Sequence, residues 1–352
     1  MMGEFAGKRV LLLGGTGSLG RVLTRRLLSG DIGLPERIVI LSRDEAKQHE
    51  MRVAYAGLPR PTDEIIYANF QRMLQFRIGD IRHQDSVARA LDGIDIVVNA
   101  AAMKQVPTCE YFPHEATMTN VVGPQNLMTA VAQAPRPPEA VIGVSTDKAV
   151  EPVNVMGMTK ALQERLMIAA QLALPQTRVL LVRYGNVLAS RGSVVPLFLQ
   201  QVRAGGPLTI TDPAMTRFLL SLDAAVDAIA LALRHAGRGD ILVPRVASAA
   251  MVDVARALIG DRPIAMVTTG IRPGEKLHEV LISAEESRRA VDHGGFHLIR
   301  PMLPELALPP SADAPGREYS SATDPMSATE VAAMLAAHGL TASAAADGEL
   351  LR

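Results

Sequence analysis

The segment RVLLLGGTGSLG, residues 9–20, decides the fold of this chain. A short, mostly apolar run leads directly into a cluster of glycines, and apolar residues then recur at helical spacing over residues 18–28. Glycine is needed where the backbone turns sharply or approaches a phosphate closely, and the N-terminus of the following helix offers free N–H groups to an anion. We therefore predict a strand, a phosphate-binding turn and a helix, although a glycine-rich segment taken alone also fits a plain tight turn.

Further apolar runs extend the same pattern along the chain. They cover residues 37–41, 76–78, 94–100, 140–145 and 179–183, and helices are expected between them at 85–91, 115–134 and 158–172. Near-continuous apolar strands that alternate with helices are typical of a parallel sheet covered on both faces. The chain is therefore predicted to be an α/β protein with a Rossmann-type doubly wound parallel sheet.

Beyond residue 184 the pattern loosens, which indicates a second, smaller unit. Helices are expected at 194–204, 222–234 and 251–258, and short strands at 208–211 and 241–244. We predict a Rossmann domain over 1–184, with about 208–235 added to it, and a smaller interleaved α/β substrate domain over 185–300. Residues 301–352 are rich in Ala, Pro and Ser and hold one amphipathic helix at 328–338. They are expected to form an arm that needs a partner surface, such as another subunit.

Composition limits the functions open to the chain. Lys+Arg and Asp+Glu are both 36 among 352 residues, so the net charge is zero and the basic excess of a nucleic-acid binder is missing. The single cysteine, Cys109, allows no intrachain disulfide, and the eight histidines show no ligand spacing that would predict a metal. Without a signal peptide or an apolar run of membrane-spanning length, we expect a cytoplasmic protein with no membrane insertion.

The cofactor is predicted from two turns. The end of the second strand distinguishes NAD from NADP, because an acid there binds the ribose 2′-hydroxyl whereas a cation accommodates a 2′-phosphate. Arg43 follows Ser42 at once and Lys47 lies just beyond, so NADP is predicted; the alternative is that Arg43 is a solvated loop charge and Asp44 binds NAD. In the glycine-rich turn the predicted cofactor-binding residues are Gly14, Thr16, Gly17, Ser18, Leu19 and Gly20.

The third and fourth strands are each followed by residues expected to touch the same cofactor. Asp80 and Ile81 follow the third strand and would lie beside the adenine. After the fourth strand, small side chains would let the chain pass close to the cofactor, or would serve helix–sheet packing instead; they are Ala100, Ala101 and Ala102.

The chemistry is predicted at the end of the fifth strand. Thr146, Asp147 and Lys148 stand there, and Lys160 follows at the start of a helix. Strand ends on one edge of a parallel sheet converge on the cofactor crevice, so this cluster should face the nicotinamide. A lysine such as Lys160 would normally pair with a tyrosine one turn earlier, but that position holds Met156, whose thioether cannot exchange a proton. Taken alone, Asp147 and Lys148 also fit an exposed turn with an ordinary ion pair.

These segments together resemble one family, the UDP-N-acetylglucosamine 4,6-dehydratases of bacterial capsule, lipopolysaccharide and glycoprotein sugar pathways. The resemblance is collinear over roughly residues 8–300, and some family members also have MxxxK in place of YxxxK. It implies an extended short-chain dehydrogenase/reductase, an NADP that is tightly bound and recycled, UDP-N-acetylglucosamine or a close UDP-sugar as substrate, and a homo-oligomer, dimer or hexamer. The segments that carry it are GGTGSLG, LSRDEAKQHEMR, NAAAMKQVPTCEYFPHEATMTNVVGPQN, STDKAVEPVNVMGMTKALQERL, GNVLASRGSVVPLFLQQ, ITDPAMTRFLLSLDAAVD and RPGEKLHE.

A mechanism follows for such an enzyme. Hydride leaves sugar C4 and later returns to C6, while water is lost across C5–C6. Lys148, with its pKa brought toward neutrality by burial and nearby cations, would take the C5 proton, and Asp147, held protonated, would protonate the leaving 6-hydroxyl. Thr146 would hydrogen-bond the 4-oxygen, and Lys160 would bind the nicotinamide ribose and take the 4-hydroxyl proton directly or through water. Lys104 would act as a second base or fix the substrate.

Substrate recognition is expected downstream. The family resemblance implies that Asn186, Arg217, Arg272 and Glu275 contact UDP, since a planar guanidinium pairs well with diphosphate and a carboxylate accepts from ribose hydroxyls. The MxxxK members of the family are associated with inversion at C5, so inversion is expected. Two alternatives remain: a UDP-sugar 4-epimerase, which normally relies on the missing tyrosine, and a catalytically silent NADP-binding regulator.

Overall fold

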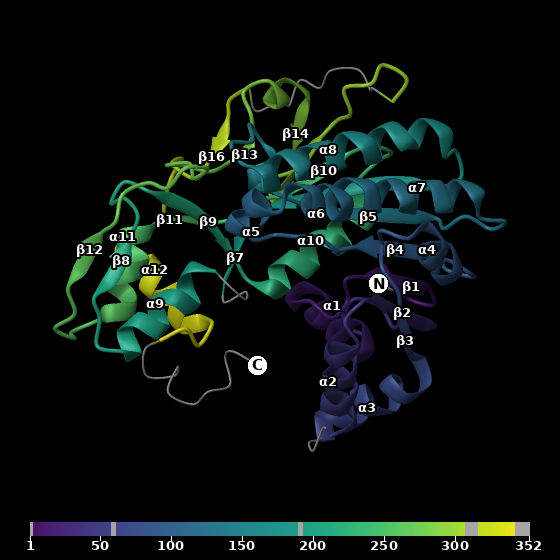
Figure 1. The fold of residues 1–352 in the computed structure, drawn as a ribbon, viewed down its shortest axis with the longest axis horizontal. Helices are drawn as coiled ribbons and strands as arrows, with labels where there is room; N and C mark the ends of the chain where they lie inside the picture. The colour runs from purple at the N-terminus through teal and green to yellow at the C-terminus, as the bar shows by residue number, and fades with distance from the viewer. Residues whose placement is uncertain (1–2, 58–60, 189–192, 307–315, 342–352) are drawn as a thin grey trace.

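A nine-stranded sheet forms the centre of the fold (Figure 1). In this computed structural model, residues 3–57, 61–188, 193–306 and 316–341 are described. All neighbouring strands from β10 onward pair in parallel, and only β15 runs in the opposite direction, because it pairs antiparallel with both β14 and β10. From one edge to the other its strands are β14 (Ala290–Asp292), β15 (Phe296–Ile299), β10 (Ile241–Pro244), β6 (Arg178–Tyr184), β5 (Ala140–Thr146), β4 (Ile96–Asn99), β1 (Arg9–Leu13), β2 (Arg37–Ser42) and β3 (Leu74–Ile78).

Helices cover both faces because the strands are apolar on both sides. Successive strand residues point to opposite faces, so Val10 and Leu12 of β1 enter one core while Leu11 and Leu13 enter the other. Around the first core lie α1 (Ser18–Ser29), α2 (Glu45–Ala56), α3 (Pro61–Met73) and α10 (Leu222–His235). Around the second lie α4 (Gln84–Ala90), α7 (Gly123–Gln133) and α8 (Val155–Ala170). The predicted doubly wound Rossmann-type fold is confirmed.

The glycine-rich turn has the close backbone approaches that its sequence predicts. Gly14 adopts φ +75°, and a Cβ there would stand 2.8 Å from Cα of Ala101. A Cβ on Gly20 would stand 2.4 Å from Cα of Gly15, so α1 can pack against the turn only with glycine at this position. Gly17 caps α1 without a side-chain hydrogen bond, and the first turn of the helix therefore keeps N–H groups for an anion.

A second cluster of elements lies at the left in Figure 1, beside the sheet. Its apolar core is shared by helices and short strands that include α9 (Val194–Arg203), α11 (Met251–Ile259), β8 (Leu208–Ile210) and β12 (Met266–Thr268). Two small sheets connect it to the rest of the chain. They are β11 (Ser248–Ala250) with β9 (Thr216–Leu220) and β7 (Asn186–Val187), and β13 (Val280–Ile282) with β16 (Tyr319–Ser320).

The structure corrects the expected division of the chain. Within 208–235, only α10 packs on the large sheet, whereas β8 pairs with β12 in the second cluster. Conversely, β10, β14 and β15 lie within 185–300 and yet extend the large sheet. The described part of the C-terminal arm also packs on its own chain, because β16 pairs with β13 and α12 (Ala328–Ala337) buries Val331 and Leu335 in the core that holds α11.

The helix expected at 115–134 contains a change of pitch. It consists of α6 (Pro113–Thr117), a π-helical turn over Met118–Val122, and α7. Pro124 has no N–H for the carbonyl four residues back, and the N–H of Gly123 bonds the carbonyl of Met118, five residues back. The turn points Asn120 inward, where its side chain bonds both backbone groups of Met103.

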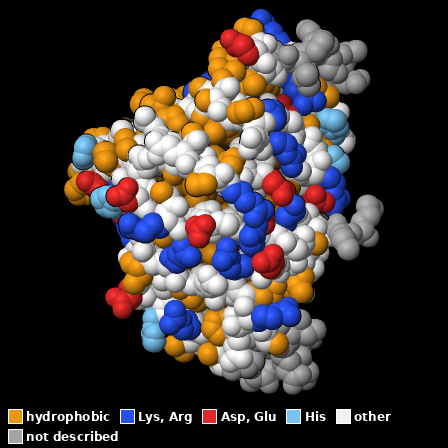
Figure 2. Space-filling model, turned by 90° about the vertical axis from the view of Figure 1, so that its right-hand side faces the viewer, with side chains coloured by type: hydrophobic (Ala, Val, Ile, Leu, Met, Phe, Trp, Pro, Cys, Tyr) orange, Lys and Arg blue, Asp and Glu red, His pale blue; other side chains and the backbone are white. Residues whose placement is uncertain are grey.

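Two surface properties bear on function. On the face shown in Figure 2, Lys and Arg side chains lie among acidic and apolar ones, and no single field of positive charge covers it. Among the described residues, no helix combines the length and the apolar character needed to cross a membrane.

Candidate functional site

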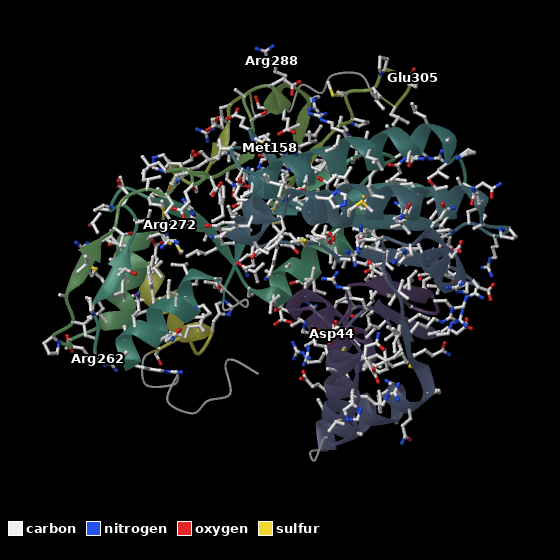
Figure 3. All side chains as sticks on the ribbon, viewed as in Figure 1. Asp44, Met158, Arg262, Arg272, Arg288 and Glu305 are labelled. Atoms are coloured by element: carbon white, nitrogen blue, oxygen red, sulfur yellow. The ribbon has the colours of Figure 1, made fainter. Side chains whose placement is uncertain are left out.

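One large cleft, with a volume of about 1930 Å³, runs between the large sheet and the second cluster. All residues predicted to bind cofactor or substrate line it, and so do all the predicted catalytic residues except Asp147. Figure 3 shows two of its walls: Asp44 stands at the start of α2, and Arg272 lies on the loop before β13. The carboxyl ends of the parallel strands open into this cleft, as the fold requires.

The nucleotide end of the cleft contains Ser42, Arg43 and Asp44. The hydroxyls of Thr16 and Ser42 lie 2.9 Å apart and connect the glycine-rich turn to the end of β2. Asp44 caps α2 by accepting from the N–H of Lys47, and its carboxylate pairs with the Lys47 ammonium at 2.6 Å. The capping hydrogen bond and this ion pair hold the pKa of Asp44 below its usual range. Arg43 keeps an exposed guanidinium, 3.9 Å from Asp80.

Asp80, which was predicted to lie beside the adenine, is engaged by Arg82. Asp80 accepts hydrogen bonds from the guanidinium and the backbone N–H of Arg82. Burial raises the pKa of Asp80, but these hydrogen bonds outweigh burial and lower it. Ile81 and Ala100 to Ala102 line the cleft, and the close approach of Ala101 to Gly14 leaves no room for larger groups between them. The positive φ of Gly14, the uncapped start of α1 and these small residues fit a dinucleotide.

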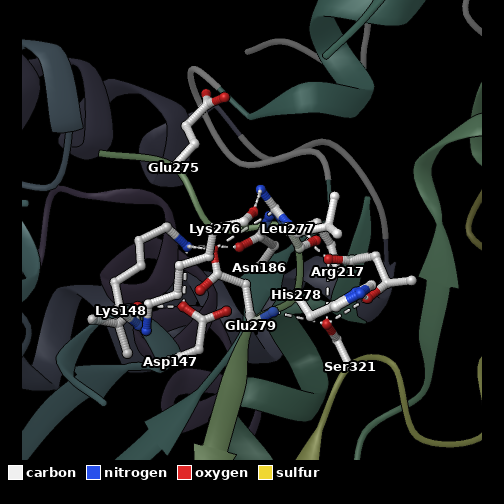
Figure 4. Close-up of polar contacts among 12 residues, drawn as sticks. Asp147, Lys148, Asn186, Arg217, Glu275, Lys276, Leu277, His278, Glu279 and Ser321 are labelled. Carbon is white, nitrogen blue, oxygen red and sulfur yellow. Dashed lines mark hydrogen bonds and ion pairs between the residues drawn. The ribbon is translucent and has the colours of Figure 1, made fainter. Parts of the chain in front are cut away.

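The Asp147–Lys148 pair sits where β5 ends (Figure 4). Asp147 is fully buried, and its Oδ1 accepts from the hydroxyl of Thr146 at 2.9 Å and from Nζ of Lys148 at 3.0 Å. Lys148 Nζ also donates to Asn186 Oδ1 at 3.1 Å and lies 3.6 Å from Glu279. The pair is thus a hydrogen-bonded acid and base at the cleft, with Asp147 fully buried and Lys148 partly buried, and the alternative of an exposed turn is wrong.

The charge state expected for Lys148 is corrected by this arrangement. Burial lowers the pKa of Lys148, but the carboxylates of Asp147 and Glu279 outweigh burial and the neighbouring Arg217. Its pKa therefore lies above the usual value, and not near neutrality as expected. Glu279, which was not predicted as a site residue, comes from a distant part of the chain and supplies the second negative charge.

Lys160 has the lowered pKa that was expected for Lys148. Its Nζ is buried and donates to the carbonyl of Val144 and to Oε1 of Gln163, both at 2.6 Å. Burial lowers the pKa of Lys160 to about 8, while the Glu164 carboxylate opposes this effect. Glu164 is itself held by Arg183 at 2.6 Å. A lysine with a pKa close to neutrality is suited to exchange a proton in this cleft.

Met156 has a packing role one turn before Lys160. It is buried against Cys109 and Ala116 in a small apolar cluster, while still lining the cleft. Asn154 caps α8 by accepting from the N–H of Gly157, and it donates to the carbonyl of Gly274. A Cβ on Gly157 would stand 2.2 Å from the carbonyl oxygen of Lys148, so this glycine lets α8 lie directly on the Asp147–Lys148 turn.

The substrate residues predicted downstream play unequal parts. Arg217 is buried, and its guanidinium donates to the backbone carbonyls of Thr216, Lys276 and Leu277. Arg217 therefore fixes the end of the RPGEK segment through its backbone carbonyls. Arg272 is exposed in that segment, and Glu275 points away from the cluster in Figure 4. Lys104 is exposed on the opposite wall.

Two site residues were not predicted from the sequence. Gln163 binds Lys160, and Glu279 faces Lys148. Glu279 ends the segment RPGEKLHE, which carried part of the family resemblance, so the signal was present although no role was assigned to it. Within the described residues, no three His, Cys, Asp or Glu side chains gather as a metal site would require.

Comparison with known proteins places this site in a family. A family described as "Polysaccharide biosynthesis protein" matches residues 10–301. The chain belongs to that polysaccharide biosynthesis protein family. It is 44% identical over 300 residues to a protein named UDP-glucose 4-epimerase from Rickettsia prowazekii, which covers 84% of this chain and 83% of that one.

Solved structures agree on the fold of this family member. Pen from Bacillus thuringiensis superposes with a TM-score of 0.83 at 30% identity, covering 96% of this chain and 99% of Pen. DesIV, a dTDP-glucose 4,6-dehydratase of Streptomyces venezuelae solved with NAD, gives 0.63 at 24% identity over 76% of this chain and 86% of DesIV. The chain thus has the extended short-chain dehydrogenase/reductase fold, which nucleotide-sugar dehydratases and epimerases share.

The pKa of Lys160 predicts how stability depends on pH. Between about pH 8 and the ordinary value of 10.5, folded Lys160 has lost its proton while unfolded Lys160 keeps it, so raising the pH favours the folded protein. Relative to Lys160→Met, the wild-type free energy of unfolding should rise by about 1.4 kcal/mol per pH unit in this window. Urea unfolding across the window measures it. A constant difference would mean that Lys160 keeps an ordinary pKa.

Proposed function

We propose that the protein is an NADP-dependent UDP-N-acetylglucosamine 4,6-dehydratase that also inverts C5. The observation that carries the proposal is the buried Asp147–Lys148 pair beside the cleft, in addition to the lysine at position 160. Chemistry confined to C4 requires one proton-exchanging group near the nicotinamide. Elimination across C5 and C6 requires a base and an acid side by side, because those two carbons are neighbours.

The pair supplies that base and acid from a single proton. In the free protein, Lys148 keeps its proton and donates it to Oδ1 of Asp147 across 3.0 Å. Movement of this proton along the hydrogen bond converts the ion pair into a neutral amine and a carboxylic acid. The amine then accepts the C5 proton, and the acid protonates the departing 6-oxygen, which leaves as water. This step restores the original ion pair, so no outside proton donor is needed.

The remaining residues serve the carbon at position 4. Lys160 lines the cleft with a pKa of about 8 and accepts the proton of the 4-hydroxyl, the task that a tyrosine at position 156 would perform. Thr146 stands beside Asp147 and hydrogen-bonds the 4-oxygen. A nicotinamide cofactor held by the glycine-rich turn would supply the hydride chemistry. Reprotonation of C5 from the face opposite Lys148, with Lys104 as the proton donor, gives the inverted sugar.

UDP-sugar 4-epimerase is the second candidate, and the names of the Rickettsia relatives favour it. An epimerase would use Lys160 in the same way but would leave Asp147 and Lys148 without a proton-transfer role. The buried pair supports the dehydratase, because an ion pair that only stabilises a turn gains little from such burial. The silent regulator is disfavoured for the same reason, since it needs neither the pair nor the lowered pKa of Lys160.

The cofactor is proposed to be NADP on the basis of Arg43. Its side chain is 61% exposed at the cleft, where a 2′-phosphate can reach the guanidinium. Asp44, which would bind the 2′-hydroxyl of NAD, is instead engaged by the cap of α2 and by Lys47. The exposed cation and the occupied acid both favour a phosphorylated ribose.

Incubation of the protein with UDP-N-acetylglucosamine in deuterated water tests the reaction. We expect loss of one water by mass spectrometry and a proton NMR signal from a new 6-methyl group. Because C5 takes up deuterium and C4 becomes a ketone, inversion is read from the C5–H couplings after a parallel reaction in ordinary water and borohydride reduction of the ketone. Asp147→Asn and Lys148→Met should each lower the rate by at least about 100-fold, because each removes one half of the acid–base pair. Glu285→Gln, which changes an exposed carboxylate, is the control.

The outcomes distinguish the candidates. A sugar of unchanged mass with altered C4 configuration, formed equally well by the Lys148→Met variant, would establish the epimerase. Bound cofactor without any conversion would favour the silent regulator, and both results contradict the dehydratase.

Substitution of Arg43 tests the cofactor. Arg43→Asp should weaken NADP binding by about tenfold or more, because a charge-assisted phosphate contact is lost, and should leave NAD binding nearly unchanged. Isothermal titration with each cofactor measures the change. Arg256→Asp removes an exposed arginine of α11 and is the matched control. An equal loss for NAD and NADP would show that Arg43 does not recognise the 2′-phosphate.

A further inference from the structure

We propose that Glu279 is a positioning residue for the reaction: it holds the Asp147–Lys148 pair in its ion-pair form until the substrate is bound. This inference rests on the proposed function and assigns a control element to the same site. Glu279 stands directly before β13, 132 positions along the chain from Asp147 (279 − 147). The fold alone brings it to Lys148.

The position of Glu279 between two cations supports this role. Its Oε1 lies 3.6 Å from Nζ of Lys148 and 3.7 Å from Nε of Arg217. Both distances are too long for hydrogen bonds, so the carboxylate acts through its charge. Only 3% of Glu279 is exposed, and water therefore screens this interaction weakly. The single negative charge of Glu279 therefore acts on both Lys148 and Arg217, and Arg217 is the residue that binds the RPGEK segment (Figure 4).

The hydrogen bonding of Glu279 is incomplete on its other side. Among the described residues, Oε2 accepts no hydrogen bond although it is buried. A buried carboxylate oxygen without a donor destabilises the fold, so stability does not explain why this acid is present. The backbone of Glu279 is nevertheless fixed, because its N–H donates to the hydroxyl of Ser321 at 2.9 Å and its carbonyl accepts from the N–H of Ser321. The carboxylate is thus held in place from behind.

Within the part of the chain that the structure describes, three charged side chains act on Lys148. Asp147 on the strand-end turn and Glu279 favour the ammonium form, and Arg217 on β9 opposes it; Asn186 on β7 is neutral. Lys276 and His278, which flank Glu279 in sequence, are turned to the carbonyl of Val150 and to the hydroxyl of Thr216. Without the charge of Glu279, only the carboxylate of Asp147 favours the Lys148 ammonium, and the guanidinium of Arg217 opposes it, so the pKa of Lys148 should fall.

Competitive acetylation of the whole protein tests this inference without any substrate. Lys148 is 22% exposed in the cleft, and only its neutral amine reacts with acetic anhydride. In Glu279→Gln, its acetylation at about pH 8.5, relative to Lys8, should rise about tenfold or more, because an opposite charge this close shifts a titration by about one to three units. In Glu279→Asp, which keeps the charge, the relative acetylation of Lys148 should stay near the wild-type value. In the control Glu285→Gln it should equal the wild-type value.

The pH profile gives the second readout. The active pair holds one proton, so loss of the Glu279 charge should move the alkaline limb of kcat/KM to lower pH by about the same one to three units. A purely structural role would lower kcat without moving that limb. Unchanged Lys148 labelling in a folded Glu279→Gln variant would overturn the inference. Changed labelling without conversion of UDP-N-acetylglucosamine would support the control element and refute the proposed substrate.

Discussion

The hydrogen bond between Lys148 Nζ and Asp147 Oδ1, 3.0 Å long at the end of β5, is the interaction on which the site depends. It places one proton between an acid and a base at the edge of the cleft. The rest of the structure holds that bond in position. The parallel strands bring the Asp147–Lys148 turn to the edge of the sheet that lines the cleft, and Gly157 lets α8 lie against the carbonyl of Lys148. Arg217 binds the carbonyl of Leu277, close to Glu279, which lies 3.6 Å from Lys148. A buried pair of this kind is costly unless its geometry is well supported.

Much of the fold could be predicted from local pattern. Apolar runs such as 10–13 and 140–144 fit strands buried on both faces, and the glycines between β1 and α1 indicate the turn into the first crossover helix. The elements that were missed depend on partners distant in sequence. β13 and β16 are three and two residues long, and each exists because it pairs with the other. The C-terminal arm was expected to need a partner surface, such as another subunit, because its contacts are also distant in sequence. In the structure α12 packs on α11 of its own chain.

In the candidate site, residue identity was predictable but charge state was not. The strand-end rule placed Thr146 and Lys148 at the cleft, and the structure agrees. The pKa of Lys148 was expected to fall through burial and nearby cations. The segment RPGEKLHE contains Glu279, but its sequence alone does not show that the carboxylate lies 3.6 Å from Lys148. The lowered pKa belongs to Lys160 instead, whose nearest carboxylate, Glu164, is already paired with Arg183. Electrostatics depend on the full set of neighbours, and those come from the tertiary fold.

The central claim is that the pair acts at C5 and C6 while hydride leaves C4 of the same sugar. The most direct measurement follows the hydrogen of C4, using UDP-N-acetylglucosamine deuterated at that carbon in ordinary water. We expect a product that has lost one water and carries the deuterium on its 6-methyl group. Deuterium that remains on C4 of a sugar of unchanged mass, with the configuration at C4 altered, would contradict it and would identify the protein as an epimerase.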